Sequence, residues 1–252
     1  MSGAVPQTAL PFTKMEAQGN DFVILDGLDR PLPSIDEAFV RTITERRYGI
    51  GCDQLLILTP SDQADAQMAI YNNDGSEAGN CGNGLRCVAD LLMRKSDRNE
   101  ASIALRDRIV HAERSENGIR VEMGSATISH ACASHIEVEI GNPHSVFFEA
   151  VDQFPHDRNI EIITGQVADH IYIDIIERGA GRTRACGSGA CATAVAIWHA
   201  EQHTRPLTIE MPGGCVTVCG NPQEILLDGV VHQTFSGHYT IRKPLQKLQQ
   251  ST

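Results

Sequence analysis

Asn-Cys-Gly-Asn-Gly at residues 80–84 returns as Ala-Cys-Gly-Ser-Gly at residues 185–189, and this pair of glycine-rich cysteine turns decides the fold. A second pair lies upstream: Gly-Asn-Asp-Phe-Val at 19–23 is echoed by Gly-Asn-Pro-His-Ser-Val at 141–146. A solenoid needs at least three repeats. Two copies instead predict a duplicated domain, with one half at residues 1–122 and the other at residues 123–240.

A helical period follows each cysteine turn. Apolar residues recur at i, i+3, i+4 and i+7 in both places, namely at 85, 88, 89 and 92 and again at 191, 194, 195 and 198. Each turn therefore leads into a helix. The second helix is small and apolar nearly all round, which is typical of a helix enclosed by other elements, here by sheet.

Short segments with a period of two indicate half-buried strands in the rest of the chain. The clearest are residues 119–123, 136–140 and 171–175, and further strands are expected at 22–25, 55–58, 146–148, 208–211 and 216–218. The protein is therefore expected to be rich in sheet, with few helices.

Composition excludes several classes of protein. The formal net charge of -11 argues against a nucleic-acid surface, which needs clustered Lys and Arg. No apolar run approaches the roughly 18 residues that cross a bilayer, and the first residues lack a secretory signal. We expect a cytoplasmic protein that binds neither nucleic acid nor membrane.

The eight cysteines are better explained by a core or by chemistry than by disulfides, because a chain of this length in a reducing compartment needs no cross-links. No pair has the CxxC spacing of zinc knuckles or thioredoxins, so we expect no metal. Six of the thiols carry no duplicated motif and are interpreted as structural: Cys52, Cys87, Cys132, Cys191, Cys215 and Cys219.

Cys81 and Cys186 are different, because each stands at the start of a predicted helix, where the first backbone N–H groups have no intrahelical partner. The helix dipole there is expected to lower a thiol pKa from its usual ~8.5. The same N–H groups can bind a carboxylate. Two such turns facing each other would place thiols on opposite sides of an amino acid, so that one removes the α-proton and the other returns a proton to the opposite face.

These residues resemble the diaminopimelate epimerase family in five blocks that follow in the family's order. The blocks are Lys-Met at 14–15 with Gly-Asn-Asp-Phe at 19–22, Asn-Asn-Asp-Gly-Ser-Glu at 72–77 with Cys-Gly-Asn-Gly-Leu-Arg-Cys at 81–87, Gly-Asn-Pro-His at 141–144, Glu-Arg-Gly at 177–179, and Ala-Cys-Gly-Ser-Gly-Ala-Cys at 185–191. The segment 123–141 is shorter than the family pattern leads us to expect.

The resemblance implies an α+β fold of two pseudo-symmetric domains, each a mostly antiparallel sheet rolled around a central helix, with residues 241–252 returning to the first half. It also implies a homodimeric isomerase that needs no pyridoxal phosphate or other cofactor. Such an enzyme interconverts LL- and meso-diaminopimelate in lysine and peptidoglycan precursor synthesis.

The resemblance also assigns roles to residues. Cys81 and Cys186 are the base and acid, Gly82 with Asn83 and Gly187 with Ser188 donate to the reacting carboxylate, and Glu177 holds the reacting amino group. The remaining positions line the substrate site: Asn20, Gln54, Asn72, Asn142, Asn159 and Arg178. His144 matches a histidine beside one thiol and is either an auxiliary catalytic group or a structural histidine.

Three alternatives remain open from the sequence. The same fold could racemise another amino acid, such as histidine. Two thiols that meet across a cleft could instead form a reversible disulfide in a redox sensor. A non-catalytic amino-acid binding protein is the third possibility.

Overall fold

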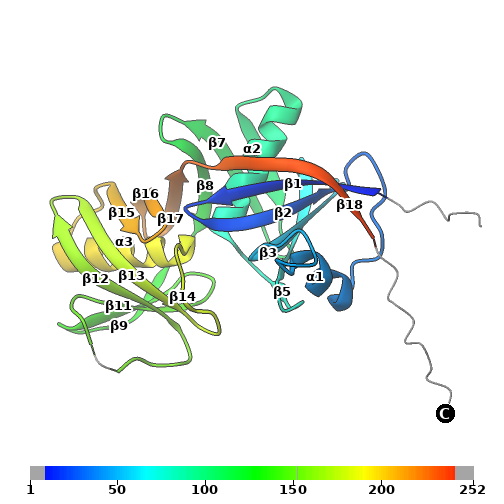
Figure 1. The fold of residues 1–252 in the computed structure, drawn as a ribbon. Helices are drawn as coiled ribbons and strands as arrows, with labels where there is room; N and C mark the ends of the chain where they lie inside the picture. The colour runs from blue at the N-terminus through cyan, green and yellow to red at the C-terminus, as the bar shows by residue number, and fades with distance from the viewer. Residues whose placement is uncertain (1–8, 152, 242–252) are drawn as a thin grey trace, which may run out of the picture.

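The computed structural model describes residues 9–151 and 153–241 of the chain as two lobes linked by a continuous sheet (Figure 1). The first lobe is built from β1 (Ala9–Ala17), β2 (Asn20–Asp26), β3 (Gln54–Thr59), β4 (Ala66–Asn72), β5 (Glu77–Ala78), β6 (Glu100–Ala104), β7 (Ile109–Ser115) and β8 (Gly118–Gly124). The second lobe contains β9 (Thr127–Ala131), β10 (His135–Glu139), β11 (Pro143–Phe147), β12 (Asn159–Val167), β13 (His170–Glu177), β14 (Gly181–Arg182), β15 (Leu207–Met211) and β16 (Gly214–Asn221).

Most neighbouring strands are antiparallel, and the exceptions fall in corresponding places of the two lobes. The strand after each upstream Gly-Asn turn pairs in parallel with a later strand, β2 with β3 and β11 with β12. β4 with β6 and β13 with β15 are also parallel. The repeated sequence thus corresponds to a repeated strand arrangement.

Each lobe encloses one long helix, and the two helices match in detail. α2 (Gly82–Ser96) packs against β1, β2, β6, β7 and β8, and α3 (Gly187–Glu201) packs against β10, β11, β12, β15, β16 and β17. Both helices begin at a cysteine and both end at a residue with left-handed backbone, Asp97 (φ 54°) and Gln202 (φ 57°). The predicted helices and their enclosure by sheet are therefore confirmed.

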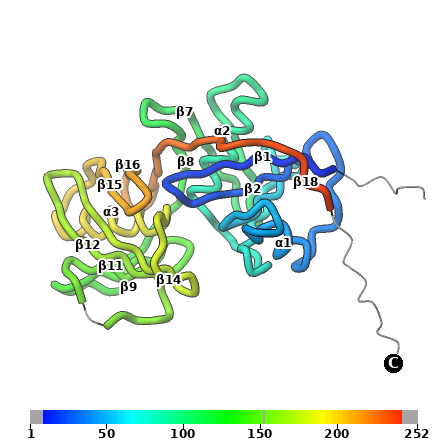
Figure 2. Tube along the Cα trace, viewed as in Figure 1, coloured from blue at the N-terminus to red at the C-terminus, as the bar shows by residue number. Residues whose placement is uncertain are grey.

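The last two strands join the lobes. β17 (Glu224–Gly229) pairs with β16 on one side and β8 on the other, and β18 (His232–Thr240) runs antiparallel beside β1 (Figure 2). Residues 242–252, for which a return to the first half was predicted, lie outside the described residues. The division of the chain at residues 122 and 123 stays a prediction.

The hydrophobic core follows the predicted strands, all eight of which fall within or largely overlap observed strands. The largest buried cluster contains the apolar residues of both α2 and α3, and a smaller one lies under the short helix α1 (Glu37–Thr44). No helix within the described ranges is long and apolar enough to cross a membrane.

Candidate active site

The two cysteine turns have the same local geometry. Cys81 is the N-cap of α2, with extended backbone (φ -156°, ψ 101°), and its Sγ accepts a hydrogen bond from the Gly84 amide at 3.4 Å. Cys186 is the N-cap of α3 (φ -135°, ψ 112°), and its Sγ accepts from the Gly189 amide at 3.3 Å. Each sulfur thus takes the capping position that a Ser or Asp side chain usually fills.

The two turns meet at their glycines. A Cβ built on Gly187 would lie 3.4 Å from the Cα of Gly82 and 3.3 Å from Oδ1 of Asn83. Leu227 of β17 packs beneath both turns, because its Cδ2 would lie within 3.0 Å of a Cβ on either glycine. The helix N-termini therefore converge on one place, as the duplicated sequence predicted.

A buried arginine organises the first turn. Nη2 of Arg86, a fully buried residue, donates to Oδ1 of Asn83 and to Oε1 of Gln18, both at 2.7 Å. Asn83 in turn donates to Oδ1 of Asn20 at 3.3 Å. The Arg86 atoms Nε and Nη1 are buried and have no hydrogen-bond partner in the part of the chain that the structure describes. The guanidinium thus places a positive charge behind Asn83, whose orientation it fixes.

Gln54 and Asn72 lie together on neighbouring strands of the first lobe. They are register partners of β3 and β4, and Nε2 of Gln54 donates to Oδ1 of Asn72 at 2.9 Å. Oε1 of Gln54 is buried and has no partner among the described residues. A buried acceptor without a donor costs about 1–3 kcal/mol, so this oxygen is suited to a ligand's N–H group.

The second lobe brings Asn142, His144 and Asn159 together. His144 and Asn159 are register partners of the parallel strands β11 and β12. The fully buried His144 ring is held on both sides, by Glu161 Oε1 at 2.8 Å from Nδ1 and by Asn142 Oδ1 at 3.1 Å from Nε2. The ring is therefore fixed in orientation.

Asn159 fixes the backbone that follows β13. Its Oδ1 accepts from the backbone N–H of Arg178 at 2.9 Å. The Arg178 side chain is exposed and donates from Nη1 to the backbone oxygen of Asp157 at 3.3 Å. Of the predicted substrate residues, Arg178 is thus the one whose charge lies outermost.

The carboxyl group of Glu177 interacts electrostatically with both thiols. Burial raises the pKa of its carboxyl, while interactions with Thr183 and with Cys186 oppose the rise. In turn, the charge of Glu177 raises the pKa of both Cys81 and Cys186. A carboxylate that acts on both sulfurs is well placed to receive an ammonium group held between them.

The predicted lowering of the thiol pKa is wrong for both cysteines. Burial raises the pKa of Cys81 to about 11, against the opposing effects of the Gly84 amide and Arg86. Burial, with the charges of Glu177 and Glu161, raises the pKa of Cys186 well above its ordinary value. The helix N-terminus favours the thiolate, but the loss of water around the sulfur outweighs it.

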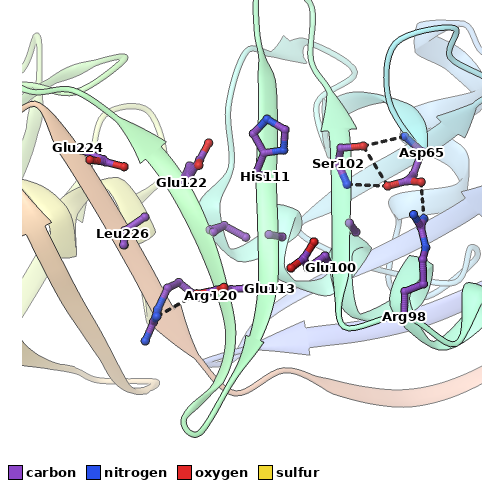
Figure 3. A pocket seen from close by; sticks show the side chains of 13 residues that line it. Asp65, Arg98, Glu100, Ser102, His111, Glu113, Arg120, Glu122, Glu224 and Leu226 are labelled. Atoms are coloured by element: carbon purple, nitrogen blue, oxygen red, sulfur yellow. Dashed lines mark hydrogen bonds and ion pairs between the residues drawn. The ribbon is translucent and has the colours of Figure 1, made fainter.

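A cavity of about 270 Å³ opens beside these groups. It is lined by Asn20, Glu177 and Ala185, the residue before Cys186, together with Gly19, Arg46, Asp53, Arg182, Thr183 and Arg184. The larger cavity, of about 420 Å³, lies elsewhere, against β6, β7, β8 and β17, and contains none of the predicted site residues (Figure 3). The smaller cavity thus reaches two predicted substrate residues, Asn20 and Glu177, and adjoins the second cysteine turn at Ala185, although neither thiol lines it.

Sequence reasoning missed two residues of this site. Glu161 is fully buried beside His144, and a Cβ on Gly189 would lie within 2.4 Å of its Oε1. A lone carboxylate in the run Ile-Glu-Ile-Ile at 160–163 was the available signal. Arg86 follows the first cysteine turn by two residues, but nothing in its sequence position indicates its hydrogen bond to Asn83.

Known proteins resemble this chain along most of its length. A sequence model of the family "Diaminopimelate epimerase" matches residues 12–129 and 137–229. The diaminopimelate epimerase of Rhodospirillum centenum is 37% identical over 265 residues, covering 90% of this chain and 91% of its own length. That of Sphingopyxis alaskensis is 34% identical and covers 90% and 96% of the two chains.

Solved structures resemble the fold at much lower sequence identity. A predicted epimerase from Pseudomonas aeruginosa superposes with a TM-score of 0.72 at 13% identity, over 92% of this chain and 100% of its own. A hydroxyproline epimerase from Agrobacterium vitis, solved with trans-4-hydroxy-L-proline, gives 0.71 at 13% identity, over 96% and 95%. The predicted α+β class with two pseudo-symmetric domains is confirmed.

Proposed function

Because this chain belongs to the diaminopimelate epimerase family and is an isomerase, we propose that Cys81 and Cys186 invert one α-carbon of diaminopimelate, interconverting the LL and meso forms. The observation that carries the proposal is the meeting of two matching cysteine turns at Gly82 and Gly187. A two-base inversion needs such a pair of acid–base groups on opposite sides of one carbon.

The number of protons on the two cysteines is the same before and after the proposed step. The thiolate of one cysteine takes the α-proton and becomes a thiol, while the opposite thiol gives its proton to the other face and becomes a thiolate. The two cysteines thus exchange roles, and the reverse reaction starts from the state that the forward reaction leaves. No redox change occurs, so the step needs no oxidant or reductant.

The helix N-termini stabilise the carbanion. The Sγ atoms use the amides of Gly84 and Gly189, which leaves the first amides of each helix, at 82–83 and 187–188, for the substrate carboxylate. Charge that develops on this carboxylate when the α-proton leaves is therefore met by fixed donors on both sides. The ammonium group that Glu177 receives adds a further positive charge beside the carbanion.

We infer that Cys81 becomes the thiolate more readily than Cys186 does. Glu177 raises the pKa of both thiols, but Arg86 partly offsets the rise at Cys81, whereas Glu161 adds to it at Cys186. A bound substrate ammonium would neutralise Glu177 and so lower the pKa of both thiols. Substrate binding thereby favours formation of the base.

The residues that bind the distal end of the substrate select diaminopimelate over other amino acids. Gln54 offers a buried acceptor, and Asn72, Asn142, Asn159 and Arg178 supply further polar groups that suit the second amino-acid end. A site built to bind polar groups rejects analogues that lack them, because its own groups are left unpaired. L-histidine, which has no second carboxylate, should be a poor substrate.

The deciding experiment follows α-proton exchange by NMR in deuterated water. We expect LL-diaminopimelate to exchange and L-histidine and a panel of other amino acids not to. Cys81→Ala and Cys186→Ala should each lower inversion by at least about 10²-fold, whereas Cys87→Ala, a buried thiol inside α2, should remain active. Exchange with another amino acid but not with diaminopimelate would show that the proposed substrate is wrong. Retained turnover in Cys81→Ala or Cys186→Ala would show that the two-thiol mechanism is wrong.

Activity measured after oxidation distinguishes a two-thiol epimerase from a redox sensor. A disulfide between Cys81 and Cys186 removes both acid–base groups, so the oxidised protein should be inactive and recover on reduction. Full activity in the disulfide form would contradict the two-thiol mechanism. The cytoplasmic location and the homodimer stay predictions from the sequence.

A further inference from the structure

A cluster of two histidines and a cysteine lies at the turn between β9 and β10, in the segment His-Ala-Cys-Ala-Ser-His at 130–135. Potential ligand atoms of His130, Cys132 and His135 all lie within 4.8 Å of one another. The backbone closes the turn, because the Cys132 amide donates to the His135 oxygen at 3.0 Å. The three side chains are accessible to solvent, and none belongs to the site described above.

The separations suit a tetrahedral ion. With Zn–S of about 2.3 Å and Zn–N of about 2.0–2.1 Å, neighbouring S and N ligands lie about 3.5 Å apart. Sγ of Cys132 lies 3.3 Å from Nδ1 of His135. One edge of the tetrahedron is therefore already close to its required length, and a ligand nitrogen of His130 lies within 4.8 Å of both atoms.

The groups around His135 support it as a ligand. Its Nδ1 faces Cys132, which leaves Nε2 directed at Oε1 of Glu137, 4.0 Å away. Glu137 is itself held by Arg158, with Nη1 at 2.9 Å from Oε2. The His135 ring stacks on Phe147, with centroids 5.0 Å apart and planes at 22°. Metal-binding histidines commonly have such a carboxylate at the other ring nitrogen.

The cluster is separate from the chemistry of the family. Residues 130–136 fall between the two stretches that match the family model. A second group, His170, Glu210 and Cys215, also brings potential ligands together, but there the histidine Nε2 already pairs with Glu210 at 2.8 Å and only one imidazole is present. The turn at 130–135 offers the softer N₂S ligand set that zinc prefers.

We propose that His130, Cys132 and His135 bind one Zn²⁺ ion, with water as the fourth ligand. The thiol loses its proton to solvent on binding, and two neutral imidazoles with one thiolate leave the site with one positive charge, near the carboxylate that Glu137 shares with Arg158. The ion would link the end of β9 to the start of β10, through ligands whose spacing, His-x-Cys-x-x-His, differs from the CxxC pattern of zinc knuckles. This proposal does not depend on the proposed catalytic function.

Cobalt provides the most direct test. The full chain, purified with chelator and reductant, is titrated with Co²⁺ while the thiolate-to-cobalt charge-transfer absorption is recorded, and Zn²⁺ retained after dialysis is counted by elemental analysis. We expect Cys132→Ser and His135→Ala to lose one equivalent of metal relative to the unaltered chain. The matched controls Cys215→Ser and His238→Ala, both exposed positions, should keep it.

The surrounding carboxylate supplies a second variant that does not remove a ligand. Glu137→Gln should weaken Zn²⁺ binding about 10- to 100-fold while the charge-transfer band keeps its shape. Epimerase activity of Cys132→Ser should stay unchanged. Equal metal content in Cys132→Ser and the unaltered chain would overturn the proposal, as would loss of the equivalent in Cys215→Ser instead.

Discussion

Gly187 and Gly82 touch: a Cβ on Gly187 would lie 3.4 Å from the Cα of Gly82, although the two residues open different helices in different lobes. Contact this close is possible because neither residue has a side chain. It sets the distance between the two sets of N-terminal amides. The geometry of the proposed carboxylate site therefore depends on these two glycines.

Gly187→Ala should lower activity while leaving the fold intact. The new methyl would lie 3.0 Å from Leu227 Cδ2 and 3.3 Å from Asn83 Oδ1, so the two turns must separate by a few tenths of an ångström. A misplacement of about 1 Å can cost about 10²-fold in rate, so this smaller displacement should lower kcat/KM by up to about 10-fold, whereas Ala in place of Gly in a helix offers up to about 1 kcal/mol of stability. Steady-state kinetics and urea unfolding measure the two effects. Gly165→Ala in β12, where the nearest atom lies at 3.5 Å, is the control; equal activity in both variants would contradict the prediction.

Arg86→Met should also lower activity with only a small effect on stability. The change removes the charged hydrogen bond to Asn83, so we expect kcat/KM to fall about 10- to 100-fold. It also removes a positive charge that lowers the pKa of Cys81, so alkylation of Cys81 at pH 9 should become slower. Unfolding free energy should change by no more than about 2 kcal/mol, because Nε and Nη1 are already buried without partners within residues 9–151 and 153–241. Unchanged alkylation of Cys81, followed by peptide mass spectrometry, would reject the electrostatic role.

The sequence was sufficient for the local elements. The recurrence of the cysteine turns predicted α2 and α3, the period of two predicted three strands, and apolar runs bounded by Gly, Asn, Pro or Asp predicted five more, because all three signals depend on neighbours along the chain. The short helix α1 was missed, since its eight residues give little more than two turns of pattern. Its start is nevertheless fixed locally, by Asp36 Oδ1, which accepts from the Phe39 amide at 2.8 Å.

The features that could not be predicted from the sequence depend on contacts between residues far apart in the chain. The dipole argument predicted a lowered thiol pKa, but the shift depends on how much water remains around the sulfur. The strands that exclude this water can be far away in the sequence: Leu227 of β17 is 146 residues from Cys81. Glu161 lies on β12 and meets His144 only because β11 and β12 are parallel neighbours. Neither effect has a local sequence signal.

Stability should fall as the pH rises above about 8.5. The folded state raises the pKa of Cys52 to about 12 and of Cys81 to about 11, and burial also raises the pKa of Cys87 and Cys191. Between the unfolded and folded pKa values the unfolded thiol loses its proton and the folded thiol keeps it, so unfolding is favoured. Each such thiol costs up to about 1.4 kcal/mol per pH unit in that window.

Urea unfolding at pH 7.5, 8.5 and 9.5 measures this slope. The double variant Cys87→Ala/Cys191→Ala should be less stable at every pH but should lose less stability between pH 8.5 and 9.5. A slope equal to that of the unaltered chain would show that these thiols do not cause the alkaline loss.

Glu161→Gln should act on Cys186 and spare Cys81. The negative charge of Glu161 raises the pKa of Cys186 and of Glu177, but it is not among the causes that shift Cys81. Gln keeps an oxygen for the Nδ1–H of His144, so the ring should stay in place and unfolding free energy should fall by only about 1 kcal/mol. Removing the charge lowers the pKa of Cys186, and its alkylation at pH 9 should become faster while that of Cys81 stays the same. Faster alkylation of both cysteines would instead indicate general loosening of the site, because a change in packing would expose both sulfurs at the contact between Gly82 and Gly187.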